Sequence, residues 1–387
     1  MPAATVVVAG TNGDNEEVVH DFSPLLLVYR SGRLERPLIM PFDSPGHDAA
    51  TGVESKDVPL SPSTFVRLYL PPEARASSDG DVDDDGDKKK AGGKLPVVVY
   101  FHGGGFVMGS AGSCVYHRFV NDLVAACPAL AVSVDYRLAP EHMLPAAYED
   151  SLAALKWVLS ATDTWLATHG DLGRVFLVGD SAGGNICHHL AMHPDVKGAG
   201  AGAGAGLKGI VLIHPWFWGK EPIGGEQEHR RPRPRPRAKR ADDAEEGRGR
   251  KKHLWEFVCP GAVDGVDDPR MNPTAPGAPA LESLACEKVM VCVAEGDHLR
   301  WRGKAYADAV ARAKKKGGEP PPPPAVAARA EVLADTAVVA CVKGGGQPAA
   351  VDVLESEGVG HVFFLLDPEM EEAKELLRRI AAFVRAK

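Results

Sequence analysis

The chain has 387 residues, of which 44% are hydrophobic and 25% charged, a composition that suits one large α/β domain or two smaller ones. Its formal net charge of −8 argues against a nucleic-acid-binding protein, which would carry a basic excess over a whole domain. The sequence contains no run of about 18 apolar residues, so it predicts no membrane span, and its first residues do not resemble a secretory signal.

Short apolar runs rich in β-branched residues alternate with amphipathic helical patterns along the chain. In chain order, we expect strands at Phe65–Leu70, Pro96–Phe101, Ala129–Asp135, Arg174–Gly179, Leu207–His214, Val289–Ala294 and Ala349–Glu355. The expected helices are His117–Cys127, Ala146–Ser160, Ser181–His193, Gly303–Lys315 and Glu369–Val384. This alternation predicts a mainly parallel sheet covered by helices on both faces. Ligands of such sheets gather at the carboxyl ends of the strands.

The second predicted strand ends in a run of three glycines, within the segment PVVVYFHGGGFVMG at residues 96–109. Glycines let backbone N–H groups approach a reacting oxygen closely, as an oxyanion hole for acyl transfer requires. We assign the donors of such a hole to Gly104, Gly105 and Ala182, with Gly103 shaping the loop. His102 is expected to brace this loop. A nucleotide-binding loop is disfavoured, because neither GxxxxGK[ST] nor GxGxxG is matched here.

The sequence GDSAGG surrounds Ser181, between an apolar strand pattern and a helical pattern. This is the context in which a GxSxG motif indicates a nucleophilic serine on a tight strand-to-helix turn. A side chain two residues before or after Ser181 would collide with the neighbouring elements. The alternative is a capping serine in an ordinary glycine loop, which the combined context disfavours.

An acid and a base are expected after Ser181 in the chain, each just past the end of a predicted strand. Asp297 follows the strand in VMVCVAEGDHLR, and His361 follows the strand in VDVLESEGVGHVFFLL. His361 would exchange a proton with Ser181, and Asp297 would orient the imidazole. Other candidates for the acid region remain open at this point: Glu295, His298, Asp264, Asp267 and Asp268. The helix after Ser181 carries His188, His189 and His193, which we interpret as surface or packing residues, because no HExxH motif is present.

Four tracts are predicted to lie outside packed structure: residues 77–94, 198–206, 224–252 and 314–349. They consist of charged runs, an alternating Gly/Ala tract, arginine–proline repeats and a five-proline run. The predicted organisation is therefore one domain over residues 1–387, interrupted by these tracts.

These motifs resemble the plant carboxylesterases, a hormone-sensitive-lipase-like branch of the α/β-hydrolases. The resemblance includes HGGGF, DYRLAPEHMLPAAYED, GDSAGGN, AEGDHLRWRGKAY and GHVFFLL, and it covers most of the chain apart from the four tracts. It implies an α/β-hydrolase fold and a serine carboxylesterase that forms an acyl-enzyme intermediate. Relatives in the family imply three alternatives: a 2-hydroxyisoflavanone dehydratase-like lyase, a gibberellin-type receptor, and an enzyme like the tuliposide-converting enzymes, which use a serine triad for intramolecular acyl transfer. The presence of His361 argues against a receptor, and Ser181 favours hydrolysis over dehydration.

One spacing departs from the family pattern. Positions 297 and 361 are 64 residues apart, and the excess coincides with the proline-rich and GGG stretch. The extra residues are either surface insertions, which loop closure tolerates, or residues added by mis-splicing.

The N-terminal segment and the region after residue 214 are expected to form a lid over the site. Aromatic residues of these segments are expected to line an apolar pocket or to pack the lid onto the sheet: Phe22, Trp216, Phe217, Trp218, Trp255 and Phe257. Such a pocket suits small-molecule esters with short acyl or aromatic groups, and no metal or organic cofactor is implied. The seven cysteines form no CxxC pair, so we expect reduced thiols and a cytoplasmic location. The sequence leaves the oligomeric state open.

Overall fold

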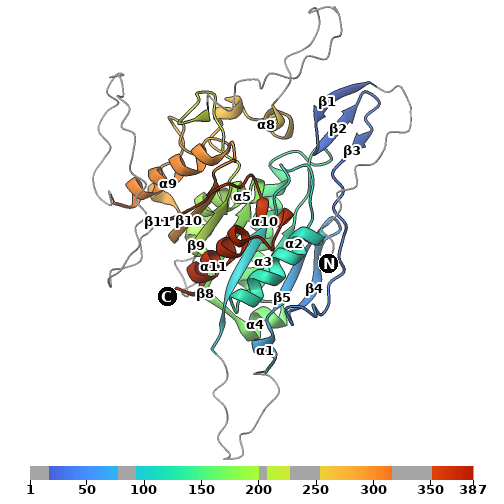
Figure 1. The fold of residues 1–387 in the computed structure, drawn as a ribbon, viewed down its shortest axis with the longest axis vertical. Coiled ribbons are helices and arrows are strands. Elements are labelled where there is room, and N and C mark those ends of the chain that lie inside the picture. The colour runs from blue at the N-terminus through green and yellow to red at the C-terminus, as the bar shows by residue number, and fades with distance from the viewer. Residues whose placement is uncertain (1–16, 77–92, 200–206, 227–252, 316–350, 387) are drawn as a thin grey trace, which may run out of the picture.

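An eight-stranded mixed sheet forms the centre of the molecule, in the order β11-β10-β9-β8-β6-β7-β5-β4 (Figure 1). The computed structural model describes residues 17–76, 93–199, 207–226, 253–315 and 351–386. The strands are β4 (Glu54–Ser61), β5 (Thr64–Leu70), β6 (Leu95–Phe101), β7 (Leu130–Asp135), β8 (Gly170–Asp180), β9 (Leu207–Ile213), β10 (Cys286–Ala294) and β11 (Val351–Ser356). Neighbours from β11 to β7 pair in parallel, whereas β5 and β4 add an antiparallel edge.

Helices cover both faces of this sheet. The longer ones are α2 (Cys114–Ala126), α3 (Ala146–Ser160), α5 (Ala182–Met192), α9 (Arg300–Lys315) and α11 (Glu371–Arg385), and the shorter ones are α1 (Pro72–Ala76), α4 (Thr164–His169), α6 (Pro194–Ala199), α8 (Leu254–Val258) and α10 (Phe363–Leu366). Helices α2 and α11 pack on one face, and α3, α5 and α9 pack on the other (Figure 1). Within β6, Val97 and Val99 join the second layer while Val98 and Tyr100 join the first. Burial on both faces explains why the parallel strands read as continuous apolar runs.

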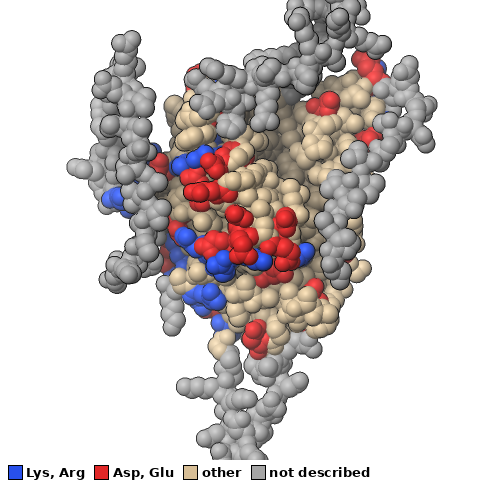
Figure 2. Space-filling model, viewed as in Figure 1, with Lys and Arg blue, Asp and Glu red and all other residues tan. Residues whose placement is uncertain are grey.

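Helix α11 has one buried side and one exposed side, as its sequence pattern predicts. Its buried residues include Leu376, Ile380 and Val384, which recur at helical spacing and face the sheet. Its outer side carries charged residues, and acidic side chains gather on this face of the molecule (Figure 2). Basic side chains lie among them, as in the ion pair between Arg378 and Glu375 at 2.8 Å. This face is therefore a solvated surface of mixed charge.

A second, three-stranded sheet lies beside the main one and consists of β1 (Val18–Phe22), β2 (Leu26–Tyr29) and β3 (Leu34–Glu35). The ring of Phe22 in β1 lies 5.0 Å from the ring of Phe257 in α8, measured between centroids. Segments far apart in the sequence thus meet above the carboxyl ends of the parallel strands (Figure 1).

The predicted fold class is confirmed, and helix α3 has the predicted bounds. Strand β4 and the small sheet were not predicted. Most residues of β4 and β1 alternate between exposed and partly buried instead of forming apolar runs, and β2 and β3 have only four and two residues. Among the described residues, no helix is both long and apolar enough to cross a membrane. Six of the cysteines lie in the described ranges, and all six are free thiols.

Most of the four irregular tracts, and with them Cys341, lie outside the described residues, and the single-domain organisation stays a prediction. Three tract boundaries were wrong, and the first is that of the tract 198–206, because α6 extends to Ala199. Glu226 was placed in the tract 224–252, yet it is 1% exposed and accepts from the Arg302 guanidinium at 2.6 and 3.0 Å. Lys314 was placed both in the predicted helix 303–315 and in the tract 314–349. It belongs to α9 and donates to the carbonyl of Cys286 at 2.8 Å. For Glu226, a long-range polar partner orders a residue whose local composition indicates a loop.

Candidate active site

Ser181 lies on the turn between β8 and α5, as its motif predicts. Its backbone angles are φ 52° and ψ −113°, a conformation that a residue with a side chain rarely adopts. Two backbone hydrogen bonds hold it: Ser181 N–H donates to Ile213 O at 2.8 Å, and Trp216 N–H donates to Ser181 O at 2.9 Å. The strained turn is therefore fixed by the neighbouring strand β9 and by the segment that follows it.

The glycines on either side of Ser181 have no room for a side chain. A Cβ on Gly179 would lie 2.4 Å from the carbonyl carbon of Gly183, and a Cβ on Gly183 would lie 1.9 Å from Phe101 O. The end of β6, the end of β8 and the start of α5 consequently pack backbone against backbone.

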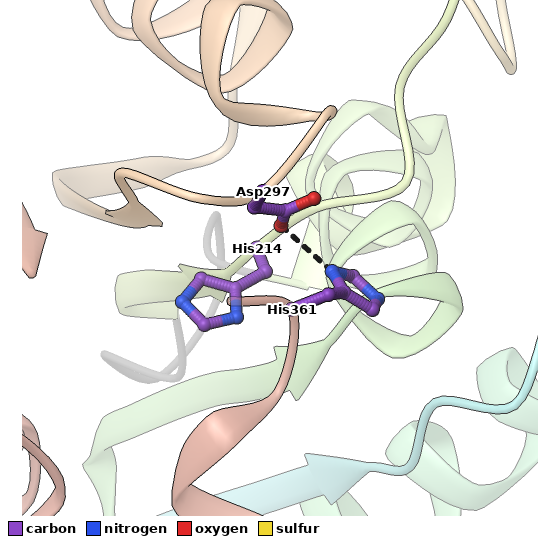
Figure 3. A group of neighbouring side chains, drawn as sticks. All are labelled: His214, Asp297 and His361. Carbon is purple, nitrogen blue, oxygen red and sulfur yellow. Dashed lines mark hydrogen bonds and ion pairs between the residues drawn. The ribbon is translucent and has the colours of Figure 1, made fainter. Parts of the chain in front are cut away.

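His361 bridges Ser181 and Asp297. Its Nε2 lies 3.0 Å from Ser181 Oγ, and its Nδ1 lies 2.7 Å from Asp297 Oδ2. A carboxylate only accepts, so Nδ1 carries the proton and the neutral ring offers Nε2 as an acceptor to the hydroxyl. This arrangement can move a proton from Ser181 to His361. Figure 3 shows the imidazole of His361 and the carboxyl group of Asp297 facing each other.

Asp297 is 2% exposed, and burial alone would raise its pKa. Hydrogen bonds from His361 and from the Leu299 N–H outweigh burial and hold the pKa of this carboxyl below its ordinary value. The loops that carry the two residues are also joined, because Gly296 N–H donates to Val359 O at 2.8 Å. Asp297 is therefore ionised and fixed beside the imidazole.

The other candidate acids have different partners. Glu295 accepts from Gly358 N–H at 2.9 Å, Asp267 accepts from Lys220 N–H at 3.0 Å, and Asp268 pairs with Arg270 at 2.6 Å. Asp264 precedes a short 3₁₀ helix, Gly265–Asp267. His298 Nδ1 lies 3.5 Å from Asp297 Oδ1, on a side chain that is 58% exposed. Within the described ranges, none of these bonds to His361.

The glycine run after β6 lies beside Ser181, since Gly104, Gly105 and Ser181 line the same cavity. Gly104 and Gly105 have φ values of +102° and +62°, which glycine adopts at little cost. Across the described parts of the chain, no oxygen accepts from the N–H groups of Gly104, Gly105 or Ala182. Gly103 N–H instead donates to Asp180 Oδ1 at 3.0 Å. The N–H groups of Gly104, Gly105 and Ala182 are thus available to a substrate oxygen, as predicted. The N–H group of Gly103 is used in a hydrogen bond within the protein.

His102 lies behind this loop. It is fully buried, its Nδ1 lies 2.8 Å from Gly103 O, and the Tyr136 hydroxyl donates to its carbonyl oxygen at 2.6 Å. On α5, His188 bonds to Tyr306 at 2.9 Å, and the ring of His189 stacks on Tyr148 at 4.0 Å. These histidines pack within the fold.

A third residue near the acid and base, His214, was not predicted. It follows β9, is 1% exposed and has a φ of +47°. Its Nδ1 accepts from Val362 N–H at 2.9 Å, next to His361. The sequence signal that could have identified His214 as a site residue was its place at the end of a predicted apolar strand. Five neighbouring parallel strands, β6 and β8 to β11, thus end at the same edge of the sheet. The residues of the site lie in the segments that directly follow these strands.

His214, Asp297 and His361 together have the ligand types of a metal site, with ligand atoms within 4.8 Å of one another (Figure 3). However, Nδ1 of His214 already accepts from Val362, which leaves the proton on Nε2. A metal ion would have to break this bond or the one between Asp297 and His361. The donor set therefore fits a hydrogen-bonded network better than a resident metal.

A cavity of about 600 Å³ opens beside Ser181 and His361. Its lining is mostly apolar. It comes from the N-terminal segment, the region after residue 214 and the C-terminal part, together with one residue of the loop after β6 and one of α2: Leu25, Leu38, Ile39, Met40, Pro41, Met108, Val115, Trp216, Trp218, Leu254, Leu299, Val362, Leu365 and Leu366. Both predicted lid segments therefore contribute to the cavity wall.

Only two of the six aromatic residues considered for the pocket, Trp216 and Trp218, line it. Phe217 lies between them in the sequence, yet its side chain is 1% exposed and its ring lies 5.0 Å from the ring of Tyr306, measured between centroids. Trp255 is fully buried and donates to Gly265 O at 3.0 Å. Phe22 and Phe257 pack on each other, as described above. These four hold the lid segments onto the fold.

Comparisons with known proteins agree with this geometry. A family model described as the alpha/beta hydrolase fold matches residues 98–318. The chain is 36% identical to probable carboxylesterase 13 of Arabidopsis thaliana, over 96% of this chain and 99% of that protein. It is 34% identical to the 2-hydroxyisoflavanone dehydratase of Glycyrrhiza echinata, over 96% of this chain and 97% of that protein.

Among solved structures, the fold resembles EstE1, a thermostable carboxylesterase cloned from a metagenomic library, with a TM-score of 0.57 and 24% identity over 90% of both chains. The extent of these matches places the chain, with its GDSAGG turn and glycine loop, in one family. The chain therefore belongs to the plant carboxylesterase family of α/β-hydrolases, and it is a serine ester hydrolase.

Proposed function

We propose that this chain hydrolyses small or aromatic carboxylic esters through an acyl-enzyme intermediate, with Ser181 as the nucleophile. The observation that supports this most directly is the pair of distances from His361, 3.0 Å to Ser181 Oγ and 2.7 Å to Asp297 Oδ2, beside an apolar cavity. These distances suit a nucleophile, its general base and the carboxylate that orients the base.

In the first half of the reaction, Ser181 Oγ attacks the ester carbonyl carbon while His361 Nε2 takes the hydroxyl proton. The carbonyl oxygen becomes an oxyanion, which the N–H groups of Gly104, Gly105 and Ala182 stabilise. Asp297 stabilises the imidazolium cation. The tetrahedral intermediate then collapses, and His361 returns the proton to the leaving alkoxide, so that the acyl group remains on Ser181.

In the second half, a water molecule replaces the alcohol. His361 takes a proton from this water as the water attacks the acyl carbon, and the proton then passes to Ser181 Oγ as the acid leaves. The same residues therefore serve both half-reactions, and no step uses a metal ion or an organic cofactor.

The cavity supports the substrate class. Its apolar lining favours a hydrocarbon or aromatic group over a charged one, because burial of apolar surface stabilises the complex by about 25 cal/mol per Å². Trp216 and Trp218 offer aromatic surface to such a group. A volume of about 600 Å³ has room for both the acyl and the alcohol part of a small ester.

Turnover of p-nitrophenyl acetate by the purified protein and by a Ser181→Ala variant tests this proposal, together with labelling by a fluorophosphonate. We expect labelling of wild type alone and a loss of nearly all turnover in the variant, which keeps its fold because alanine is smaller than serine. Variant activity within about tenfold of wild type would contradict the assignment of Ser181. Assays with a 2-hydroxyisoflavanone address lyase chemistry. A dehydration rate above the esterase rate would replace the proposed reaction.

A further inference from the structure

Asp180, the residue before the proposed nucleophile, joins two parts of the active site that are distant in the sequence. It ends β8 and is 1% exposed. Its Oδ1 accepts from the Tyr100 hydroxyl at 2.6 Å and from the Gly103 N–H at 3.0 Å. Gly103 begins the glycine run that continues into Gly104 and Gly105. The carboxyl group therefore anchors the start of the glycine loop to the strand that carries Ser181.

The second carboxyl oxygen of Asp180 also lies close to Gly103. Asp180 Oδ2 is buried and has no hydrogen-bond partner among the described residues. A Cβ built on Gly103 would lie 2.3 Å from this oxygen and 3.1 Å from the backbone oxygen of Asp180. Gly103 must consequently be glycine because of the Asp180 carboxyl group. A buried carboxyl oxygen without a partner costs free energy, so its presence calls for an explanation.

The glycine loop needs such an anchor. Gly104 and Gly105 both have positive φ and carry no side chain to fix their position. Their N–H groups stabilise an oxyanion only when they point at the place where that oxygen forms. Gly103 cannot contribute its own N–H, because Asp180 accepts from it.

We propose that Asp180 is a positioning residue for oxyanion stabilisation: its carboxyl group fixes Gly103 so that the N–H groups of Gly104 and Gly105 face the reacting carbonyl oxygen. This inference rests on the proposed ester hydrolysis. It assigns Asp180 no contact with the reacting atoms. Its effect should therefore appear in the transition state and not in ground-state binding.

Three variants separate this role from a general structural one. Asp180→Ala removes the acceptor for Gly103 N–H, Asp180→Asn retains an acceptor oxygen, and Tyr100→Phe removes the other donor to the same oxygen without touching the loop. Active sites are first counted by fluorophosphonate labelling, so that kcat refers to folded enzyme with a reactive serine. The readouts are kcat and KM for p-nitrophenyl acetate and Ki for a trifluoromethyl ketone, whose adduct with the serine carries an oxyanion.

For Asp180→Ala we expect kcat to fall about 10²-fold, the effect of a misplacement of roughly 1 Å, with KM nearly unchanged. The Ki of the trifluoromethyl ketone should rise by a similar factor, because that adduct resembles the transition state. Asp180→Asn and Tyr100→Phe should each stay within about tenfold of wild type in kcat. If Asp180→Ala does not fold, Asp180→Ser replaces it, since a serine hydroxyl is too short to reach Gly103.

A double-variant cycle tests the contact itself. Gly103→Ala should lower kcat by about 10²-fold or more in wild type, because its Cβ collides with Asp180 Oδ2. In the Asp180→Ala background the same change should cost much less, because only the backbone oxygen at 3.1 Å remains close to the added Cβ. Wild-type kcat and Ki in Asp180→Ala, or equal costs of Gly103→Ala in both backgrounds, would overturn the proposal. Turnover by Ser181→Ala would instead overturn the proposed function, so the two failures are distinguishable.

Discussion

Gly183 lies so close to Phe101 that a Cβ on the glycine would come within 1.9 Å of the phenylalanine carbonyl oxygen. Gly183 lies in the first turn of the helix after Ser181, and Phe101 ends the strand before the glycine loop. Their contact sets how near the proposed nucleophile lies to the proposed oxyanion donors. The motif glycine is therefore required by a strand 82 positions earlier in the chain (183 − 101).

Gly183→Ala should consequently destabilise the fold and abolish turnover. The added methyl group meets backbone atoms that cannot rotate away, so we expect a loss of about 3 kcal/mol or more in the free energy of unfolding. Urea titration followed by tryptophan fluorescence measures this loss. Gly360→Ala is the matched control, because a Cβ at Gly360 meets nothing within 4 Å. Equal stability of the two variants would show that the packing described here is wrong.

Asp297→Asn should leave the cavity intact but impair catalysis. An amide no longer holds the imidazole in the tautomer that accepts from Ser181, and in serine proteases the equivalent change lowers kcat by about 10⁴. Steady-state kinetics with p-nitrophenyl acetate measure the effect. Asp268→Asn is the control, since Asp268 pairs with Arg270 and should keep kcat within about tenfold. A crippled Asp268→Asn beside an active Asp297→Asn would identify a different acid.

His214→Phe should weaken catalysis through the loop that carries His361. Burial lowers the pKa of His214 to about 3, so the ring stays neutral and accepts from Val362 N–H. Phenylalanine leaves this N–H without its acceptor, at a cost of about 1–3 kcal/mol, and we expect kcat to fall about tenfold. His214→Asn should restore much of the loss, because its side-chain oxygen can accept from the same N–H. His193→Phe, at the end of α5, should behave like wild type. A fully active His214→Phe would rule out this positioning role.

The free energy of unfolding should fall as the pH drops below 6.5. Burial lowers the pKa values of His188 and His214 to about 3 and of His102 and His189 to about 4, from an ordinary value of 6.5. Below pH 6.5 the unfolded chain therefore binds protons that the folded protein does not, which favours unfolding. Urea midpoints between pH 7.5 and pH 4.5 measure this trend. A midpoint that stays constant over this range would contradict it.

Asp180 should oppose that trend. Burial raises its pKa from 3.8 to about 6, so between these values the folded protein binds a proton that the unfolded chain releases. Acidification through this window stabilises the folded state at this one site. Asp180→Asn lacks the titration, so its midpoint should fall more steeply than that of wild type between pH 6 and pH 4. Parallel curves for the two proteins would contradict the raised pKa.

Much of the fold was predictable from the sequence because its signals are local. The continuous apolar run of β6 indicates a strand that is buried on both sides. The helical spacing of apolar residues in α11 indicates a helix that is buried on one side. The turn at Ser181 was predictable for the same reason, since glycines on both sides of a serine, between a strand and a helix, constrain the backbone there. By contrast, β4 alternates between exposed and partly buried residues, and its assignment depends on pairing with β5.

The sequence by itself determined the fold family, the strand-to-helix turn at Ser181 and the place of His361 after the last strand, because short-range backbone preferences and burial patterns encode them. Only the tertiary structure decided which acid approaches His361, which aromatic residues face the cavity, and that Asp180, His214 and Glu226 have specific partners. Each of these depends on side chains brought together from positions 64 to 148 residues apart, or on the direction in which one side chain points. Local propensity contains no information about such distances, because they follow from the order in which the strands pair in the sheet.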